Sequence, residues 1–300
     1  MKKIILIDVA NLFYRAFFAV PKTLPHNAVF GSASVLLSIL EHCQPDFQLA
    51  FRDERGGTFR HEKCENYKAQ RAAMPEDLAQ QMPKIDELFA SFAIPVFSKK
   101  GFEADDGIAT AVRKFRSSEN EILICSTDQD LFSLVQENVF ILRPASRKFE
   151  KIDAQKVFEK IGVGPAKVLD FKAIAGDASD NLPGIAGIGK KGAAKLLGEF
   201  GTLQNLQENL QKVEGRNGKL LRENFDLALQ TRELIELQDN LEFSNFTLAR
   251  SSVANFSPEK ASQFMSEMNF KMLSRRLAKM PQFATMQREN ESESQLQLFA

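Results

Sequence analysis

The sequence predicts an α/β fold: a mostly parallel sheet with helices on both faces, followed by a smaller, mainly helical domain. Short apolar runs alternate with stretches of helical periodicity in the first half of the chain, and this alternation is typical of parallel sheets. From about residue 160 the strand signals fade, while Gly and Lys become frequent and short helices follow one another. The length of 300 residues leaves room for two domains.

Four apolar runs are expected to form the strands of the sheet, and three periodic stretches its helices. The expected strands are 4–7, 46–51, 94–97 and 122–125, and the expected helices are 31–42, 76–92 and 104–116. We place a domain boundary near residue 160, so that the sheet domain covers 1–160 and the helical domain covers 161–280. Residues 281–300 are mostly polar and charged and are expected to form a disordered tail.

The overall composition restricts the function only weakly. The chain has 39 basic and 39 acidic residues, whereas many DNA-binding proteins are basic, although a zero net charge can hide segregated charges. Three cysteines, an odd and sparse number, fit a reducing cytoplasm better than a disulfide framework. Asp8 interrupts the first apolar run too early for a signal peptide, and no segment is apolar enough to span a membrane. We therefore expect a cytoplasmic protein.

Acidic residues follow each of the four expected strands. Asp8 follows the first strand, Asp53 the second, Glu103, Asp105 and Asp106 the third, and Asp128 and Asp130 the fourth. Because ligands bind beyond the carboxyl ends of parallel strands, we expect these carboxylates to meet at one edge of the sheet. Asp177 and Asp180 add two more, and their i,i+3 spacing would place them on one helical face.

Nine carboxylates in one place would need cations to compensate their repulsion. Hard oxygen ligands suit Mg²⁺ or Mn²⁺ better than zinc, and two such ions about 4 Å apart can activate a water and stabilise the leaving oxygen of a phosphodiester. The histidines show no ligand spacing, and Cys64 and Cys125 form no zinc pattern. Each acid taken alone also has a simpler interpretation, because Asp is common after strands as a helix cap or turn residue.

Several motifs around these acids together resemble one protein family. They are Asp8 to Arg15; Asp53 with Phe59-Arg60-His61-Glu62; Tyr67-Lys68-Ala69-Gln70-Arg71; Glu103-Ala104-Asp105-Asp106; Thr127-Asp128-Gln129-Asp130; and Gly176-Asp177-Ala178-Ser179-Asp180-Asn181-Leu182-Pro183-Gly184. Over about residues 4–280 the chain resembles the 5′-nuclease domain of bacterial DNA polymerase I, a branch of the flap endonuclease family. Two positions depart from the family pattern: Val9 stands where Gly is usual, and Lys190-Lys191-Gly192 replaces Glu-Lys-Thr.

The resemblance implies a PIN-like, Rossmann-like nuclease domain and a helical helix–hairpin–helix domain that clamps DNA. It implies that the nine acids bind two or three divalent ions, Mg²⁺ or Mn²⁺, and that neither departure removes a ligand. It further implies 5′-3′ exonuclease and flap endonuclease activity in replication or repair, on branched or nicked duplex DNA with a 5′ single strand. The family normally continues into a polymerase, so we expect a stand-alone, monomeric, nucleoid-associated nuclease.

The stretch 60–71 combines four basic residues with an aromatic ring, which suits a single-stranded 5′ end. The basic residues are Arg60, Lys63, Lys68 and Arg71, and the ring is that of Tyr67. In the family this stretch forms a helical arch over the active site, here expected near 60–85, and Lys68 and Arg71 match residues that contact the scissile phosphate. Arg15, seven residues after Asp8, is expected to face the same site. The alternative is an ordinary solvated helix face.

Residues 182–193 are expected to form a hairpin between two helices. Glycines let a backbone approach phosphate closely, and the following helix offers its N-terminal N–H groups. Gly184, Gly187, Gly189, Lys190 and Lys191 are therefore expected to bind DNA without reading its sequence. The resemblance adds that this element often holds a potassium ion. The alternative is a plain Gly-rich turn.

Two other functions remain open at this point: a PIN-like ribonuclease, and a structure-specific DNA-binding protein with a degenerate site. The hairpin indicates a duplex DNA substrate, which argues against the ribonuclease. The full set of acids argues against the degenerate site. The chain ends in large apolar residues after a polar run. This end looks like the short peptide with which bacterial replication proteins bind the sliding clamp, through Gln295, Leu296, Leu298 and Phe299. The alternative is an end that packs back on its own domain.

Overall fold

Six strands form a single sheet in this computed structural model, which describes residues 1–145 and 148–281. The strand order is β3-β2-β1-β4-β5-β6, and every neighbouring pair is parallel except β5 and β6. The strands are β1 (Lys2–Asp8), β2 (Phe47–Phe51), β3 (Val96–Phe97), β4 (Asn120–Cys125), β5 (Val139–Ala145) and β6 (Lys148–Ile152). The predicted α/β class and mostly parallel sheet are confirmed.

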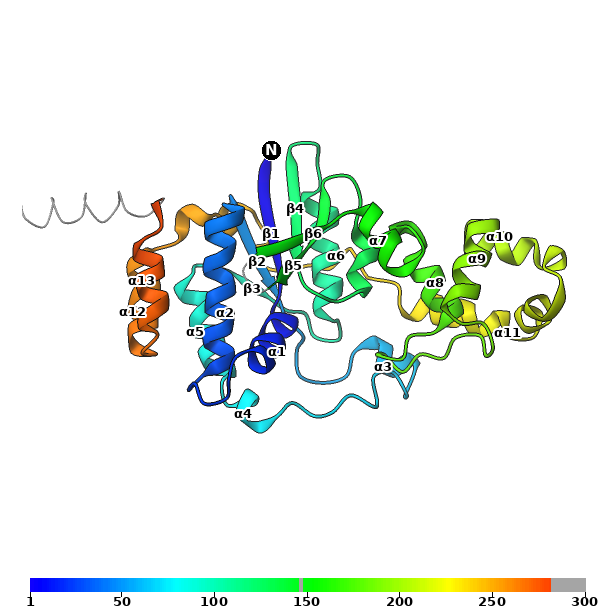
Figure 1. Cartoon of the computed structure of the whole chain (residues 1–300), viewed down its shortest axis with the longest axis horizontal. Coiled ribbons are helices and arrows are strands. Elements are labelled where there is room, and N and C mark those ends of the chain that lie inside the picture. Colours follow the sequence, from blue (N-terminus) through cyan, green and yellow to red (C-terminus); the bar gives the residue numbers. More distant parts are fainter. Residues whose placement is uncertain (146–147, 282–300) are drawn as a thin grey trace, which may run out of the picture.

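Helices cover both faces of the sheet and continue into a separate helical region (Figure 1). On the sheet domain they are α1 (Val9–Ala19), α2 (Asn27–Ser38), α3 (Phe59–Lys63), α4 (Glu76–Ala79), α5 (Met82–Ser91), α6 (Ala104–Phe115) and α7 (Ala154–Ile161). The helical region contains α8 (Val168–Ala175), α9 (Lys190–Phe200), α10 (Leu203–Glu208) and α11 (Gly215–Leu234), and α12 (Pro258–Glu267) and α13 (Lys271–Ala278) follow. Shorter turns are a π turn at Ile39–Cys43 and 3₁₀ turns at Asp130–Leu134, Pro165–Lys167, Leu210–Lys212, Ala249–Ser251 and Val253–Asn255.

β1 is buried on both faces, which explains why it is an unbroken apolar run. Ile5 and Ile7 point into the core under α1, α2 and α5, whereas Ile4 and Leu6 point into the core under α6. Successive side chains of a strand face opposite ways, so a strand covered on both sides needs apolar residues at every position. Asp8 ends this strand between the ends of β2 and β4.

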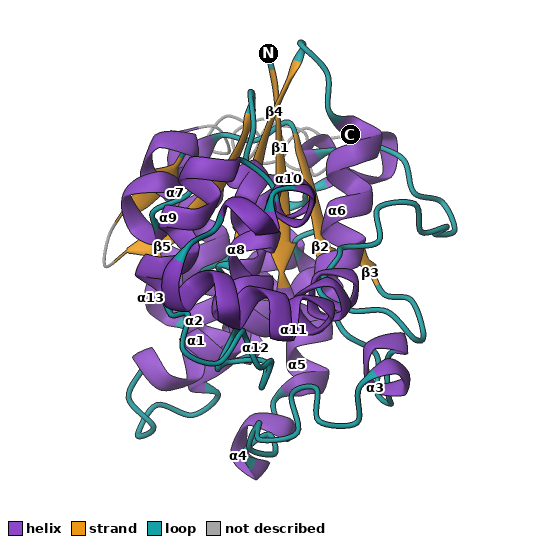
Figure 2. Ribbon diagram, turned by 90° about the vertical axis from the view of Figure 1, so that its right-hand side faces the viewer, coloured by secondary structure: helices purple, strands orange, loops and turns teal. Residues whose placement is uncertain are grey.

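Some local predictions need correction. β5 and β6 were not predicted. The helix expected at 76–92 is divided into α4 and α5, and the one expected at 31–42 begins earlier, as α2, and ends in the π turn. The expected helical arch is mostly not helical, because 64–75 contains only turns and irregular backbone between α3 and α4 (Figure 2). Lys68 has a φ of 53° and Pro75 lies just before α4, and both interrupt a helical path.

The expected extent of the helical domain is also wrong at its end. After α11 the chain returns to the sheet domain, where Phe246 packs under α6 and Phe264 and Leu273 pack with α2 and α5. α12 and α13 therefore lie beside α2, at the opposite end of the molecule from α9 (Figure 1). The apolar faces of these helices complete the core there. No helix in the described part of the chain is both long and apolar enough to cross a membrane.

Candidate metal and DNA site

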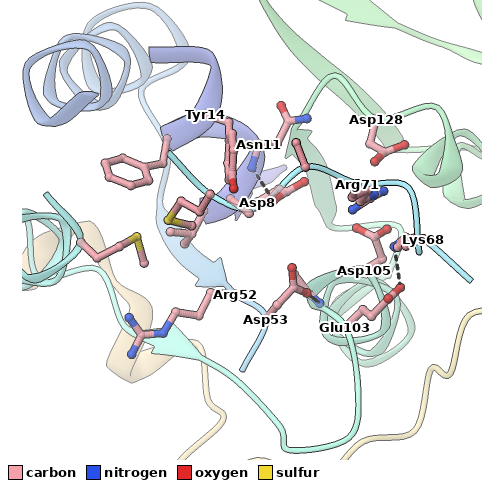
Figure 3. A pocket seen from close by; sticks show the side chains of 17 residues that line it. Asp8, Asn11, Tyr14, Arg52, Asp53, Lys68, Arg71, Glu103, Asp105 and Asp128 are labelled. Carbon is pink, nitrogen blue, oxygen red and sulfur yellow. Dashed lines mark hydrogen bonds and ion pairs between the residues drawn. The ribbon is translucent and has the colours of Figure 1, made fainter. Parts of the chain in front are cut away.

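The carboxyl ends of the parallel strands open onto a cavity of about 540 Å³ (Figure 3). Five of the predicted acids line it with two of the predicted cations: Asp8, Asp53, Glu103, Asp105, Asp128, Lys68 and Arg71. Acids that follow four different strands thus meet at one edge of the sheet, which is the arrangement expected from their positions in the sequence.

Asp8 lies at the centre of this edge because β1 lies between β2 and β4. Its carboxylate caps α1 by accepting a hydrogen bond from the Asn11 N–H at 3.0 Å, and it accepts another from the Ser126 hydroxyl at 3.0 Å. Burial is the main reason why the pKa of Asp8 is raised to about 6, and the charge of Asp53 adds to the effect. The capping role and a place in the site are therefore compatible.

Three other acids of the cavity, Asp53, Asp105 and Asp128, also have raised pKa values. Burial, then Asp128 and Asp8, raise the pKa of Asp105 well above its ordinary value. Burial and then Asp130 raise the pKa of Asp128 to about 7. Burial raises the pKa of Asp53 although the Ala104 N–H donates to its carboxylate at 2.7 Å. Crowded acids with raised pKa values are typical of a functional site that cations complete.

A second cavity, of about 710 Å³, shares Asp128 and Arg71 with the first and is also lined by Asp130 and Asp177. Lys172 lies between these last two acids: its ammonium donates to Asp130 and, at 2.7 Å, to Asp177. Burial alone would raise the pKa of Asp177, but the Lys172 ammonium lowers it to about 2. Sequence reasoning missed Lys172, although a lysine inside the mostly apolar helix α8 is a signal that could have found it.

Lys68 and Arg71 face the carboxylates, as predicted. The Lys68 ammonium donates to Glu103 Oε2 at 3.0 Å, and the Arg71 guanidinium donates to Asp180 Oδ1 at 2.8 Å. Both cations enter the site from the irregular stretch that crosses the edge of the sheet between α3 and α4. Asp180 is 3% exposed at its side chain, so Arg71 covers it from the solvent side.

Arg60 and Asp106 are placed differently from the prediction. Arg60 is 1% exposed and Asp106 is 0% exposed, and they form a bidentate pair with distances of 2.8 and 2.7 Å. The Asp106 oxygens also accept hydrogen bonds from the backbone N–H groups of Glu103 and Gln238. Arg60 is therefore not on a DNA-facing surface, and Asp106 lies beneath the cavity with both oxygens engaged.

Tyr67 is 3% exposed, so it is not an open platform for a base. Its hydroxyl donates to Glu103 Oε2 at 3.0 Å, which orients that carboxylate. Burial and the Glu103 charge raise the pKa of Tyr67 far above its ordinary value, so the phenol stays a donor. The aromatic residue of this stretch supports the site from inside.

Arg15 does not face the carboxylates, because its guanidinium donates to the Pro144 carbonyl at 3.1 Å and lines an apolar cavity beside Phe18. The face of α1 toward the site carries Asn11 and Tyr14. Arg15 follows Tyr14 and lies about 100° further round the helix, so it points away from that face. Asn11 Oδ1 accepts hydrogen bonds from the Thr127 N–H and hydroxyl, both at 3.0 Å. It thereby ties α1 to the loop after β4. Sequence reasoning missed both residues.

The predicted hairpin lies between α8 and α9, as expected. Gly184 packs against the backbone of Ala175 and Gly176, where an added Cβ would lie 2.3 Å from main-chain atoms. Gly187 has a φ of +88°, a left-handed conformation that favours glycine. Gly189 is the N-cap of α9, and Lys190 and Lys191 are exposed at the start of that helix. Two cations and free helix N–H groups therefore share one surface, next to the second cavity.

The donor set of the two cavities fits a hard divalent cation, because it consists of carboxylate oxygens. Within residues 1–145 and 148–281, no group of three His, Cys, Asp or Glu side chains is arranged closely enough to hold one ion. Lys68, Arg71 and Lys172 form ion pairs with Glu103, Asp180, Asp130 and Asp177. These ammonium and guanidinium groups compensate the acids at the rim, while Asp8, Asp105 and Asp128 keep raised pKa values.

Two family models together match most of the chain. The model described as "5'-3' exonuclease, N-terminal resolvase-like domain" matches residues 3–162, and the one described as "5'-3' exonuclease, C-terminal SAM fold" matches residues 163–259. DNA polymerase I of Caldicellulosiruptor bescii and that of Bacillus subtilis are both 34% identical over 92% of this chain. The chain spans about a third of the length of these curated relatives, 33% and 32% respectively.

Solved structures agree on the fold. A T5 5′-exonuclease with bound zinc has a TM-score of 0.67 and 21% identity, over 89% of this chain and 98% of that one. A bacteriophage T5 flap endonuclease complex with DNA and metal ions has a TM-score of 0.68 and 21% identity, over 91% and 100%. The catalytic core of Rad2 with DNA substrate has a TM-score of 0.58 and 17% identity, over 93% and 92%.

Proposed function

The chain belongs to the 5′-3′ exonuclease family, and from that premise we propose that it is a Mg²⁺-dependent nuclease that cuts branched or nicked DNA at 5′ flaps and ends. The resemblance drawn from its motifs is thus confirmed at the level of the family. One observation carries the proposal: acids from four strand ends share a single cavity with Lys68 and Arg71. Acids and phosphate-binding cations side by side suit hydrolysis of a phosphodiester.

Asp8, Asp53, Glu103, Asp105 and Asp128 would hold one divalent ion, and Asp128, Asp130, Asp177 and Asp180 a second. A two-metal mechanism is general for the family, and such ions supply Lewis acidity and a nucleophile at neutral pH. The protein's own part is electrostatic. Lys68 and Arg71 can transfer their hydrogen bonds from Glu103 and Asp180 to the oxygens of a bound phosphate, because both cations already lie at the mouth of the cavity. Mn²⁺ would fit the same donors.

Duplex DNA would bind at the hairpin and the start of α9. Lys190 and Lys191 supply charge, and the helix N-terminus supplies N–H donors, so contacts would go to phosphates and not to base edges. The turn between α8 and α9 would also be the place for a potassium ion. This duplex surface beside the acids favours a DNA flap over single-stranded RNA, which a PIN-like ribonuclease would cut.

A labelled 5′ flap, incubated with and without Mg²⁺, tests the proposal. We expect cleavage only with Mg²⁺, and much faster than cleavage of single-stranded RNA of the same length. Asp128→Ala and Asp130→Ala should each abolish cleavage but leave flap binding largely intact, because duplex and metal occupy different parts of the chain. Cleavage by either variant at near wild-type rate, or preference for RNA, would contradict the proposal.

We also propose that the C-terminal peptide binds the bacterial sliding clamp through Gln295, Leu296, Leu298 and Phe299, which lie outside the described residues. The support is the sequence alone, where three large apolar side chains follow a polar run. A titration of the clamp with the full chain and with a chain that lacks the last six residues tests this. Equal affinity of the two would disprove the clamp contact.

A further inference from the structure

Arg60 is buried at a junction where three distant parts of the chain meet. Its Nε donates to the Leu234 carbonyl at 3.0 Å, and its Nη2 donates to the Glu236 carbonyl at 3.0 Å as well as to Asp106. Its Nη1 donates to the other Asp106 oxygen at 2.8 Å and more weakly to Glu103 at 3.4 Å. Every nitrogen of the guanidinium is therefore engaged, and the planar group fixes its partners relative to one another.

The three parts have different functions in the proposed mechanism. Arg60 lies on α3, where the stretch toward Lys68 and Arg71 begins. Asp106 lies in the first turn of α6, directly beside Asp105 and Glu103. The two carbonyls lie at the exit of α11, the last helix of the helical region: Leu234 ends the helix, and Glu236 follows in the returning segment. A shift of any one part would strain the other two.

The stretch after α3 also touches the hairpin region directly. The Lys68 N–H donates to the Asp180 carbonyl at 2.9 Å, and the Asn181 side-chain amide donates to the Asn66 carbonyl at 2.7 Å. The helical region thus holds the stretch that carries Lys68 at two places: through Asp180 and Asn181 in the loop after α8, and through the contacts of Arg60 with the exit of α11.

We propose that Arg60, through its buried pair with Asp106, is a positioning residue that couples duplex binding on the helical region to the placement of Lys68 and Arg71. The inference rests on the proposed function, since it assumes that duplex DNA binds at the hairpin and the start of α9. A duplex seated on the helical region would restrain the exit of α11. The pair transmits that restraint to α3 and to the acidic end of α6, so the stretch that carries the phosphate-binding cations is held more firmly on a bound duplex.

Hydrogen exchange of the backbone amides in 60–71 tests this coupling in the full chain. The probe is a blunt duplex without a 5′ single strand, added in EDTA so that nothing enters or is cut at the acidic site. We expect the duplex to slow exchange in this stretch about fivefold or more in the wild type, within the usual range of coupling between sites. Arg60→Met combined with Asp106→Leu removes the pair without leaving an unpaired buried charge, and should abolish the slowing.

Arg113 and Asp239 provide a matched control. Their ion pair of 2.7 Å joins the same two elements, α6 and the returning segment, but its side chains are 61% and 50% exposed. Arg113→Met with Asp239→Asn should therefore leave both the exchange effect and flap cleavage unchanged. Single-turnover cleavage of a saturating flap should slow about tenfold or more in the Arg60/Asp106 double variant, whereas its duplex Kd should change less than about twofold. Arg60→Lys, which keeps the charge, should be intermediate.

The outcomes separate the inference from the proposed function. Normal duplex protection in the double variant would overturn the coupling, and so would a duplex Kd that weakens in step with the cleavage rate. A wild-type chain that binds no duplex would overturn the proposed function and the coupling with it. If thermal denaturation shows that the double variant does not fold, Arg60→Lys takes its place, and full protection in that variant overturns the coupling.

Discussion

Arg60, Lys68 and Arg71 lie on one short stretch, yet only the last two line the acidic cavity. The Arg71 side chain is 51% exposed, that of Lys68 13% and that of Arg60 2%. A cation close to solvent can exchange its carboxylate partner for a substrate phosphate, whereas a buried one is fixed by its desolvation cost. The residue types make this stretch positively charged, and the burial of each side chain decides whether it can bind a phosphate or is fixed in an internal ion pair.

Lys68→Ala and Arg71→Ala test this division. Each should slow single-turnover cleavage about a hundredfold or more, because each removes a donor aimed at the phosphate. Duplex affinity and its salt dependence should barely change. Lys63→Ala is the control, since Lys63 lies on the same stretch but pairs with Glu233 on the exposed surface. Equal losses of cleavage and affinity in the Lys68 and Arg71 variants would reduce both to ordinary surface contacts.

The pKa of Asp8 predicts how the metal-free protein responds to pH. Burial raises this pKa to about 6, against about 4 in an unfolded chain. Between these values the folded state binds a proton that the unfolded state has lost, so the free energy of unfolding falls as the pH rises. In EDTA at neutral pH, Asp8→Asn should therefore melt a few degrees above the wild type, and near pH 4 the difference should vanish.

Asp46→Asn should behave in the opposite way. Burial alone would raise the pKa of Asp46, but hydrogen bonds from the Lys3 N–H, at 2.8 Å, and the Lys2 ammonium lower it. The charged form of Asp46 therefore stabilises the fold. Its removal should lower the melting temperature at neutral pH and matter less in acid. An Asp8→Asn variant that melts below the wild type at neutral pH in EDTA would contradict the raised pKa.

At the scale of elements, the hairpin between α8 and α9 depends on one close contact. Gly184 lies so near the backbone of Ala175 and Gly176 that no side chain fits, and the Ile185 N–H donates to the Ile174 carbonyl at 2.8 Å. This contact fixes where α9 begins, and with it the direction in which Lys190 and Lys191 point. The geometry of the duplex surface thus depends on a residue that contributes no side chain.

Gly184→Ala should destabilise the protein by about 1–3 kcal/mol, because the backbone must move apart, and should weaken duplex binding as α9 shifts. Gly198→Ala is the matched control, since nothing lies within 4 Å of an added Cβ at that position of α9. That substitution should stabilise the protein by about 0.5–1 kcal/mol and leave the duplex Kd unchanged. Thermal denaturation and duplex titration measure both, and an undisturbed Gly184→Ala protein would contradict the close contact.

At the scale of the whole molecule, the chain builds one site from segments far apart in the sequence. Acids come from the sheet, cations from the stretch between α3 and α4, and further acids from the loop after α8. The returning segment then closes the sheet domain with α12 and α13. Because the acids repel one another, the fold should be more stable when divalent ions are bound.

Mg²⁺ at millimolar concentration should raise the melting temperature by a few degrees at neutral pH, since it binds the folded state alone. Na⁺ at equal ionic strength is the control for simple screening, and its effect should be smaller. Asp128→Asn should melt higher than the wild type in EDTA, because burial and Asp130 raise the pKa of this acid to about 7, and should gain less from Mg²⁺. No shift with Mg²⁺ in the wild type would count against a clustered site.

The sequence by itself determined the parallel sheet, the meeting of Asp8, Asp53 and Asp128 at one edge, and the family. These follow from local pattern, because a strand's end and its next residue are both read along the chain. Only the tertiary structure decided that Arg60 and Asp106 form a buried pair, that Arg15 faces away from the acids, and that Lys172 lies between Asp130 and Asp177. The burial of a side chain and its choice of partner depend on segments that are far apart in the sequence but in contact in the fold. Arg60 donates to the Glu236 carbonyl, for example, and no local sequence pattern encodes such a contact.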